Sequence, residues 1–168
     1  MSRSKSLPLG YAQLNRRRPT ALVIVGDVRQ GEDQKTFDEL RLSIPNSKII
    51  VTRYISHKDI PAYYAPMDVF VHSSLRDGMP NALLEAVACE KAVAATPVGG
   101  TTEVLEHRKN GILVSVNDAN ILAEKIQELL DNPEKRSALG KNARQLIMES
   151  LHQRKNWKRI WYFIKKSV

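Results

Sequence analysis

The chain has 168 residues, of which 42% are apolar and 26% are charged, with one cysteine and a formal net charge of +8. A domain holds roughly 100–200 residues, so this length predicts one domain and excludes two full-sized lobes around a cleft. The apolar runs fall far short of the ~20 residues that span a bilayer, and one cysteine excludes an intramolecular disulfide, so we expect a soluble, cytoplasmic protein.

Apolar runs of strand length alternate along the chain with stretches of helical periodicity. The predicted strands cover residues 21–27, 48–52, 68–73, 91–96 and 111–116. The predicted helices cover residues 7–14, 35–44, 58–67, 80–90, 119–131 and 134–149, with a loop and short helix over 98–107 and a last helix over about 152–165. This alternation predicts an α/β fold with a doubly wound, mostly parallel sheet.

Two loops are suited to an anionic ligand, because ligands bind such sheets at the carboxyl ends of the strands. The loop 73–79 leads into a helix through Pro80, and the free N–H groups and dipole of a helix N-terminus suit a phosphate. The loop 96–102 contains Gly99 and Gly100, and paired glycines let the backbone approach a ligand closely. Two such loops side by side favour a diphosphate.

Two acids near the first of these loops are candidate site residues. Glu85 lies in the apolar run 82–88, where burial of a carboxylate costs several kcal/mol unless something pairs with it. Either a ligand hydroxyl is that partner, or Glu85 lies on an exposed strip of the helix or pairs with a structural arginine. Asp77 stands at the mouth of the same helix, where it either contacts a ligand or complements the helix N-terminus.

Three motifs carry a resemblance to a known family. They are DGMPNALLEAVA (77–88), VGGTTEV (98–104) and NGILV (110–114). Over about residues 12–150, the chain resembles the carboxy-terminal half of the family 4 (group 1) retaining glycosyltransferases, which have the GT-B fold. The resemblance implies that residues 1–168 form a single Rossmann-like domain. That domain would bind a nucleotide diphosphate sugar for retaining transfer of the sugar to an acceptor held by a second lobe or chain.

The resemblance also implies roles for individual residues. In the family, two acids separated by seven residues face the donor. Here that catalytic pair is Asp77, which would hold the sugar hydroxyls, and Glu85, which would hold the ribose hydroxyls. The other donor-binding residues that the resemblance implies are Gly78, Met79, Pro80, Asn81, Ala82, Leu83, Val98, Gly99, Gly100 and Thr101, with Tyr54 and Ile55 near the base. The chain has no Asp-x-Asp sequence, so we expect neither a metal nor any cofactor apart from the donor substrate.

The chain departs from the family pattern at several positions. A first strand and a loop with basic residues that clamp the diphosphate usually precede the segment that is here 7–18, so we expect the domain to be incomplete and inactive alone. Asp77 is one methylene shorter than the usual Glu, and His72 stands where Leu is common. Arg53 stands where Gly is common, and residues 90–92 replace a Gly-x-Pro sequence. The alternative function is therefore a non-catalytic nucleotide-binding or protein-interaction module.

The positive charge is concentrated at the two ends of the chain. Residues 1–19 hold five bases and residues 151–168 hold six, neither segment has an acid, and the rest of the chain carries a net charge of −3. Because the body lacks this basic excess, no nucleic-acid partner is expected. The segment 151–168 predicts a basic amphipathic helix with Trp157 and Trp161 one turn apart. That helix either packs on its own domain or meets an acidic partner or the anionic inner face of a membrane.

The expected partners follow from the same observations. The nucleotide-sugar donor is the ligand that the resemblance implies. A sheet without its first strand leaves an edge unpaired, and unpaired edges associate with other chains. We therefore expect either a homo-oligomer or a complex with a separate acceptor-binding lobe.

Overall fold

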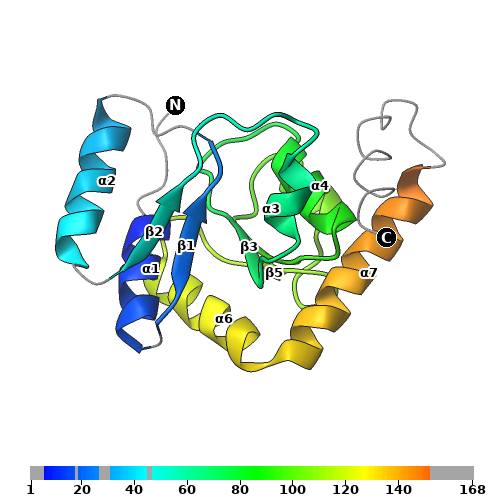
Figure 1. The fold of residues 1–168 in the computed structure, drawn as a ribbon. Helices are drawn as coiled ribbons and strands as arrows, with labels where there is room; N and C mark the ends of the chain where they lie inside the picture. The colour runs from blue at the N-terminus through cyan, green and yellow to red at the C-terminus, as the bar shows by residue number, and fades with distance from the viewer. Residues whose placement is uncertain (1–5, 18, 27–30, 45–46, 152–168) are drawn as a thin grey trace.

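The computed structural model describes residues 6–17, 19–26, 31–44 and 47–151 (Figure 1). Its helices are α1 (Ser6–Arg17), α2 (Glu32–Ser43), α3 (Ile60–Tyr64), α4 (Asn81–Ala88), α5 (Thr101–Val104), α6 (Ala119–Asp131) and α7 (Pro133–Leu151). Its strands are β1 (Ala21–Ile24), β2 (Lys48–Val51), β3 (Val69–His72), β4 (Ala92–Ala95) and β5 (Ile112–Leu113). Each of the five predicted strands is present, which confirms the predicted α/β alternation. The predicted terminal helix beyond residue 151 lies outside the described residues.

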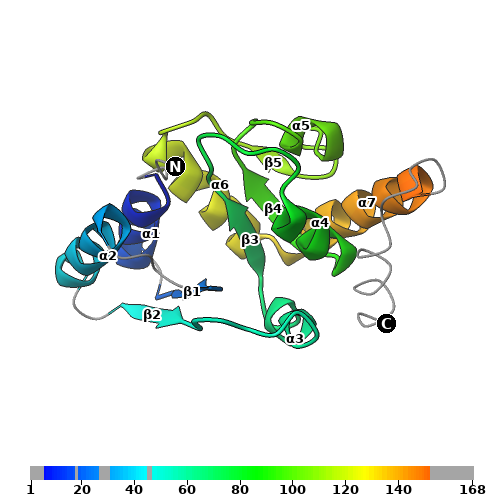
Figure 2. The same ribbon diagram turned by 90° about the horizontal axis from the view of Figure 1, so that it is seen from above.

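The strands are parallel, as predicted, but their hydrogen bonds divide them into two sheets. β1 pairs with β2, and the other strands pair in the order β3-β4-β5. Within the described ranges no ladder joins β1 to β3, so each of these two strands has one edge without a strand partner. Figure 2 shows α4 and α7 on one side of β3-β4-β5, and α6 and α1 on the other. The second sheet therefore has the two-sided helical cover of a doubly wound fold.

β4 forms the centre of the core because its small side chains let helices approach both faces. All four of its residues are buried. Side chains alternate between the faces of a strand, so Val93 and Ala95 join an apolar cluster with α4 and α7. Ala92 and Ala94 join a second cluster with α1, α6 and β5. A strand buried on both faces reads as a continuous apolar run, which explains why the sequence shows no alternation here.

Helix α1 connects the two sheets. Its Leu14 is buried in the cluster that contains β4 and α6, whereas its Tyr11 is buried with Ile44 in a cluster beside β1 and β2. The Tyr11 hydroxyl donates to the Thr20 carbonyl oxygen at 3.0 Å, just before β1 begins. Gly10 approaches α6 so closely that a Cβ there would lie 3.2 Å from a carbonyl oxygen of that helix. The contact of α1 with α6 thus fixes the first sheet relative to the second.

Two of the departures from the family pattern have a visible backbone consequence. Arg53 follows β2 with a φ of 57°, and Glu90 follows α4 with a φ of 56°. Both values lie in the left-handed region, which costs a residue with a Cβ roughly 1–2 kcal/mol. The chain therefore keeps at these positions a backbone conformation that favours glycine, although its side chains are Arg and Glu.

Candidate functional site

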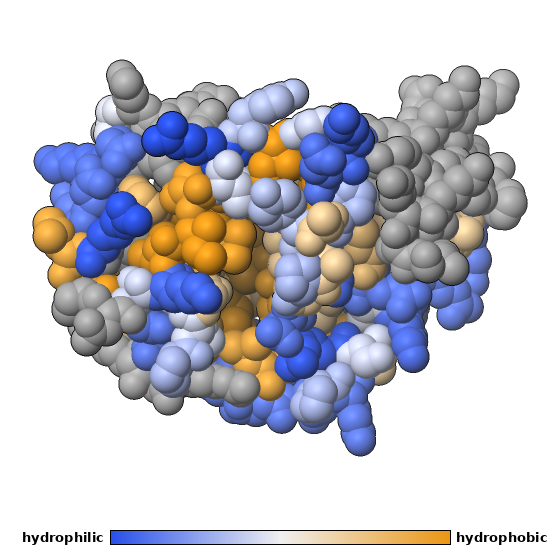
Figure 3. Space-filling model, in the orientation of Figure 1, coloured by the Kyte–Doolittle hydropathy of each residue, from blue (hydrophilic) through white to orange (hydrophobic). Residues whose placement is uncertain are grey.

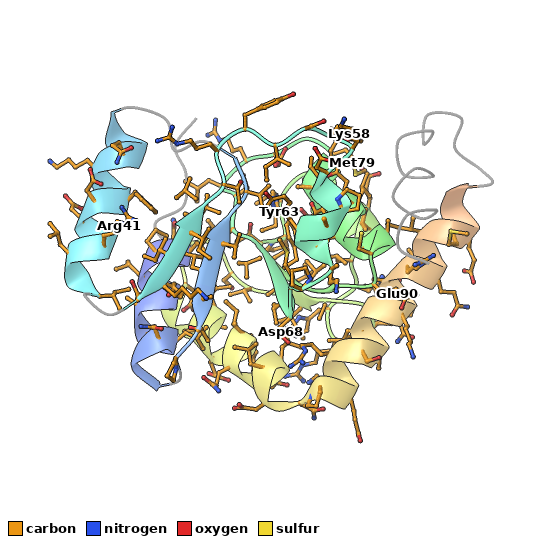
Figure 4. All side chains as sticks on the ribbon, in the orientation of Figure 1. Arg41, Lys58, Tyr63, Asp68, Met79 and Glu90 are labelled. Carbon is orange, nitrogen blue, oxygen red and sulfur yellow. The ribbon has the colours of Figure 1, made fainter. Side chains whose placement is uncertain are left out.

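The two glycine-containing loops meet where β3 and β4 end. In Figure 4, Asp68, which directly precedes β3, lies low in the molecule, and Met79, in the loop that follows this strand, lies near the top. The Gly100 N–H donates to the Gly78 carbonyl oxygen at 2.7 Å, and the Thr96 hydroxyl donates to the Ser74 carbonyl oxygen at 2.6 Å. The two loops thus lie side by side, as the sequence predicts.

Gly99 is required for this junction. Its φ is 52°, and a Cβ at this position would lie 1.8 Å from the Asp77 carbonyl oxygen. No side chain fits at that distance, so any larger residue would push the loop after β4 away from Asp77. The glycine pair therefore permits the contact between the loops themselves, in addition to any approach to a ligand.

The N-terminus of α4 lies at the same junction. Pro80 is its N-cap residue, and no side chain caps the helix. Gly78, Asn81 and Ala82 are exposed, so their backbone can face a ligand. Pro80 and Leu83 are buried, and the Leu83 N–H donates to the Pro80 carbonyl oxygen at 3.1 Å. The N–H groups that suit an anion are thus those at the exposed positions that precede Leu83.

Asp77 is paired with a histidine of the preceding strand. Its Oδ2 lies 3.2 Å from the Nε2 of His72, and the two side chains are 31% and 16% exposed, respectively. Burial lowers the pKa of His72, and the neighbouring carboxylate only partly offsets this effect. His72 is therefore neutral at neutral pH, and the pair is an imidazole–carboxylate contact without a full positive charge.

Glu85 is buried, with 4% of its surface exposed. The Tyr64 hydroxyl lies 3.3 Å from its Oε2, and the Nε2 of His57 lies 3.6 Å from its Oε1. Glu85 is thus not on an exposed strip of α4. A buried carboxylate needs a partner, and here Tyr64 of α3 and His57 of the preceding turn are such partners, where the sequence suggested an arginine or a ligand.

Tyr64 and His57 are the site residues that the sequence analysis does not name. The spacing of the chain gives no reason to connect the segment 57–64 with Glu85, because the contact depends on how α3 packs against α4. One weak signal exists in the sequence. Glu85 lies in an apolar run that contains no basic residue, so a partner for it, once it is buried, has to come from elsewhere in the chain.

The remaining predicted site residues lie around this junction and beyond β2. Met79 and Val98 are half-buried, and Met79 packs against Gly100. Thr101 is fully buried at the start of α5. Tyr54 is 85% exposed and Ile55 is half-buried, both just after β2. These last two residues therefore lie in the segment that follows the β1–β2 sheet.

The described part of the chain contains no cluster of three or more His, Cys, Asp or Glu residues that could hold a metal ion. Among the described helices, none combines the length and the apolar character needed to cross a membrane.

Comparison with known proteins places the chain among glycosyltransferases. Residues 9–146 match the family model described as glycosyl transferases group 1. An uncharacterized glycosyltransferase of Methanocaldococcus jannaschii is 32% identical over 139 residues, which are 82% of this chain and 34% of that protein. The capsular polysaccharide biosynthesis glycosyltransferase CapM of Staphylococcus aureus is 27% identical over 83% of this chain and 36% of its own length. The chain thus spans about a third of the length of these curated relatives.

Solved structures of glycosyltransferases share the fold. The C-terminal domain of the group 1 family protein LpcC from Francisella tularensis has a TM-score of 0.78 at 22% identity, over 88% of this chain and 78% of that domain. Anabaena HepE in complex with UDP-glucose has a TM-score of 0.73 at 25% identity, over 96% of this chain and 43% of HepE. The fold is therefore that of one lobe of a GT-B glycosyltransferase.

Proposed function

Because the chain belongs to the group 1 glycosyltransferases, we propose that it is the donor-binding domain of a retaining enzyme of family 4 type. It would bind a nucleoside diphosphate sugar and present the sugar to an acceptor held by a second lobe or chain. The observation that carries the proposal is the junction of the loops after β3 and β4 at the uncapped N-terminus of α4. Anabaena HepE has the same fold, and its complexes with UDP and with UDP-glucose support a nucleotide-sugar ligand.

The diphosphate would lie at the N-terminus of α4. Gly78, Asn81 and Ala82 are exposed residues, no side chain caps the helix, and their N–H groups together with the positive end of the helix dipole offer donors to its oxygens. Such preorganised donors also stabilise the diphosphate as it leaves, when the anomeric carbon exchanges the phosphate oxygen for an acceptor oxygen. The proposal includes no metal ion, since the sequence has no Asp-x-Asp motif and this backbone supplies the stabilisation.

The two acids would hold hydroxyl groups of the donor. Asp77 lies at the loop junction, where its half-buried carboxylate can accept from sugar hydroxyls. Glu85 lies deeper, and an ionised carboxylate has about four lone-pair sites, so it can accept from a ribose hydroxyl in addition to its contact with Tyr64. Tyr54 and Ile55 would lie near the base, for which the exposed ring of Tyr54 offers a stacking surface.

A calorimetric panel of UDP, GDP and ADP, each with and without an attached sugar, tests this proposal on the 168-residue chain. We expect weak binding of one nucleoside diphosphate. Hydrogen bonds to a charged group contribute about 1.5–3 kcal/mol, so Glu85→Gln should weaken that binding about tenfold or more. Glu134→Gln, at an exposed position of α7, is the matched control and should leave the affinity unchanged. Absence of binding by every nucleotide at millimolar concentration would overturn the proposal and favour a protein-interaction module.

We also propose that the chain transfers no sugar when it is alone. The acceptor must be held against the anomeric carbon and water must be excluded, and both tasks need a surface facing the junction. The proposed partners are an acceptor-binding lobe, a second copy of the chain, and an anionic membrane that the basic segment 151–168 would meet. Robust transfer to a defined acceptor by the chain alone would contradict the need for a second surface.

A further inference from the structure

His72 and Asp77 differ in how firmly the fold holds them. His72 is the last residue of β3 and pairs with Ala95 of the buried strand β4. Its carbonyl oxygen accepts from the Thr96 N–H at 3.0 Å, so its backbone is fixed by the core of the domain. Asp77 lies on the loop that follows, and 31% of its side chain is exposed. The fold therefore holds the imidazole of His72 firmly in place, whereas it holds the carboxylate of Asp77 less firmly.

Two hydrogen bonds join the loop around Asp77 to the segment that follows β4, and in both of them the loop contributes a backbone carbonyl oxygen. The Thr96 hydroxyl donates to the Ser74 carbonyl oxygen, and the Gly100 N–H donates to the Gly78 carbonyl oxygen. These bonds place the Cα of Asp77 and leave the rotamer of its side chain open. The Nε2 of His72 lies 3.2 Å from Oδ2 of Asp77, but it is buried without a hydrogen-bond partner because the two groups are not aligned for one. A small turn of the Asp77 carboxylate would complete that bond and thereby select the rotamer.

The surroundings of the ring keep it neutral. Asp77 is the charged group that acts on His72. Ala95 of β4 and Thr96 just after it pair with the His72 backbone, and neither of them titrates. Burial lowers the pKa of His72 more than Asp77 raises it. A neutral imidazole with its proton on Nε2 donates one hydrogen bond and leaves the negative charge of the carboxylate in place.

We propose that His72 is a positioning residue for the donor sugar: it donates from Nε2 to Oδ2 of Asp77 and thereby holds Oδ1 toward the sugar hydroxyls. This inference rests on the proposed function, and it adds a residue to which the comparisons assign no role. It also connects two departures from the family pattern, since the acid that is one methylene short contacts the histidine that stands in place of leucine. The imidazole of His72 would hold in place a carboxylate whose side chain is short and lies on a loop.

The donor-binding test is a double-mutant cycle with UDP-glucose, or with the nucleotide sugar that binds best in the panel above. A lost hydrogen bond to a charged group costs about 1.5 kcal/mol or more, so His72→Leu should weaken binding of the nucleotide sugar about tenfold. Its effect on the nucleoside diphosphate without the sugar should be much smaller. Asp77→Glu alone should also weaken binding, because the longer side chain would collide with the imidazole ring of His72. The double variant should recover most of the loss, since leucine removes the ring that obstructs the longer acid.

A second measurement examines the pair without any donor. The imidazole resonances of His72, assigned by their loss in His72→Leu, should titrate below the usual 6.5 and show the proton on Nε2 at neutral pH. Asp77→Asn removes the contribution that raises the pKa of His72, so the pKa should fall further. Asp38→Asn, on the exposed surface of α2, is the matched control and should not move it.

The two experiments separate the inference from the proposed function. If the wild-type chain binds no nucleotide, the proposed function is overturned, and the imidazole titration alone decides whether the pair exists. If the chain binds the nucleotide sugar and His72→Leu binds it equally well, or if Asp77→Asn leaves the pKa of His72 unmoved, the positioning role is overturned while the proposed function stands.

Discussion

Asp77 at the loop junction and Glu85 within α4 each have an imidazole beside them. His72 lies 3.2 Å from Asp77, and His57 lies 3.6 Å from Glu85. The two pairs differ in depth, because 16% of the His72 side chain is exposed against 41% for His57. His72 is therefore part of the folded core of the site, whereas water and ligands can reach His57. Because burial lowers the pKa of His72, its protonation is coupled to folding.

Acidification should destabilise the domain through His72. The folded state has a lowered pKa for this group, so below pH 6.5 the unfolded chain binds more protons than the folded chain, and stability falls as the pH falls. Thermal unfolding at pH 7.5, 6.5 and 5.5 should show a declining Tm, in a range where exposed carboxylates stay ionised. The decline should be shallower in His72→Leu. Equal slopes in the two proteins would contradict the link between His72 and stability.

At the scale of secondary structure, most elements could be predicted from local patterns. The helix over 119–131 has the bounds that its periodicity predicts, and its N-cap Asp118 accepts from the Ile121 N–H at 2.9 Å. The strand over 111–116 is shorter than predicted, with only Ile112–Leu113 in the ladder. Beyond it the Val114 N–H still donates to the Ala95 carbonyl oxygen at 2.8 Å, so the contact with β4 extends one residue further than the ladder.

The candidate site could be predicted only in part. Asp77, Glu85 and the two loops stand out because they are local in sequence and chemically unusual. The contacts of Glu85 with Tyr64 and His57 could not be predicted, since they join segments 21 and 28 residues apart through the packing of α3. The division of the strands into two sheets could not be predicted from local sequence either. Each strand has the same apolar pattern whether or not another strand pairs with its edge.

The turn after α4 allows a test of what a non-glycine residue costs in left-handed backbone. Glu90 keeps a φ of 56° after this helix, and left-handed backbone costs a residue with a Cβ roughly 1–2 kcal/mol. Glu90→Gly should therefore be more stable than Glu90→Ala by about 1 kcal/mol in urea unfolding. Both variants lose the contact of Glu90 with Arg144, so their difference isolates the backbone. An alanine variant as stable as the glycine variant would show that this turn is unstrained.

At the scale of the whole molecule, the first sheet leaves apolar surface uncovered. Val23, Val25 and Ile50 of the β1–β2 region are 37%, 41% and 41% exposed. Figure 3 shows an apolar patch on this side of the molecule next to a hollow in the surface. β1 and β3 also have edges without a strand partner among the described residues. Exposed apolar surface and an open strand edge together favour association with another chain.

We expect the isolated chain to self-associate through this region. Light scattering coupled to size exclusion should give a mass that rises with concentration, and the rise should persist at high salt because the contact is apolar. Val23→Lys should reduce the association, since a charge on an edge strand opposes pairing. Leu42→Lys, at an exposed position of α2, controls for the added charge. A monomer of constant mass at high micromolar concentration would contradict the expectation.

The division into two sheets also determines how the domain comes apart. β4 is buried on both faces, whereas residues of β1 and β2 alternate between exposed and half-buried, and the first sheet is tied to the rest through α1. Elements with few buried contacts open at a lower free energy than the global unfolding reaction. We therefore expect the segment around β1 and β2 to lose amide protection and become open to proteases while β3, β4 and β5 stay folded. The domain then behaves as a stable half that carries the loop junction and a less stable half that contributes Tyr54.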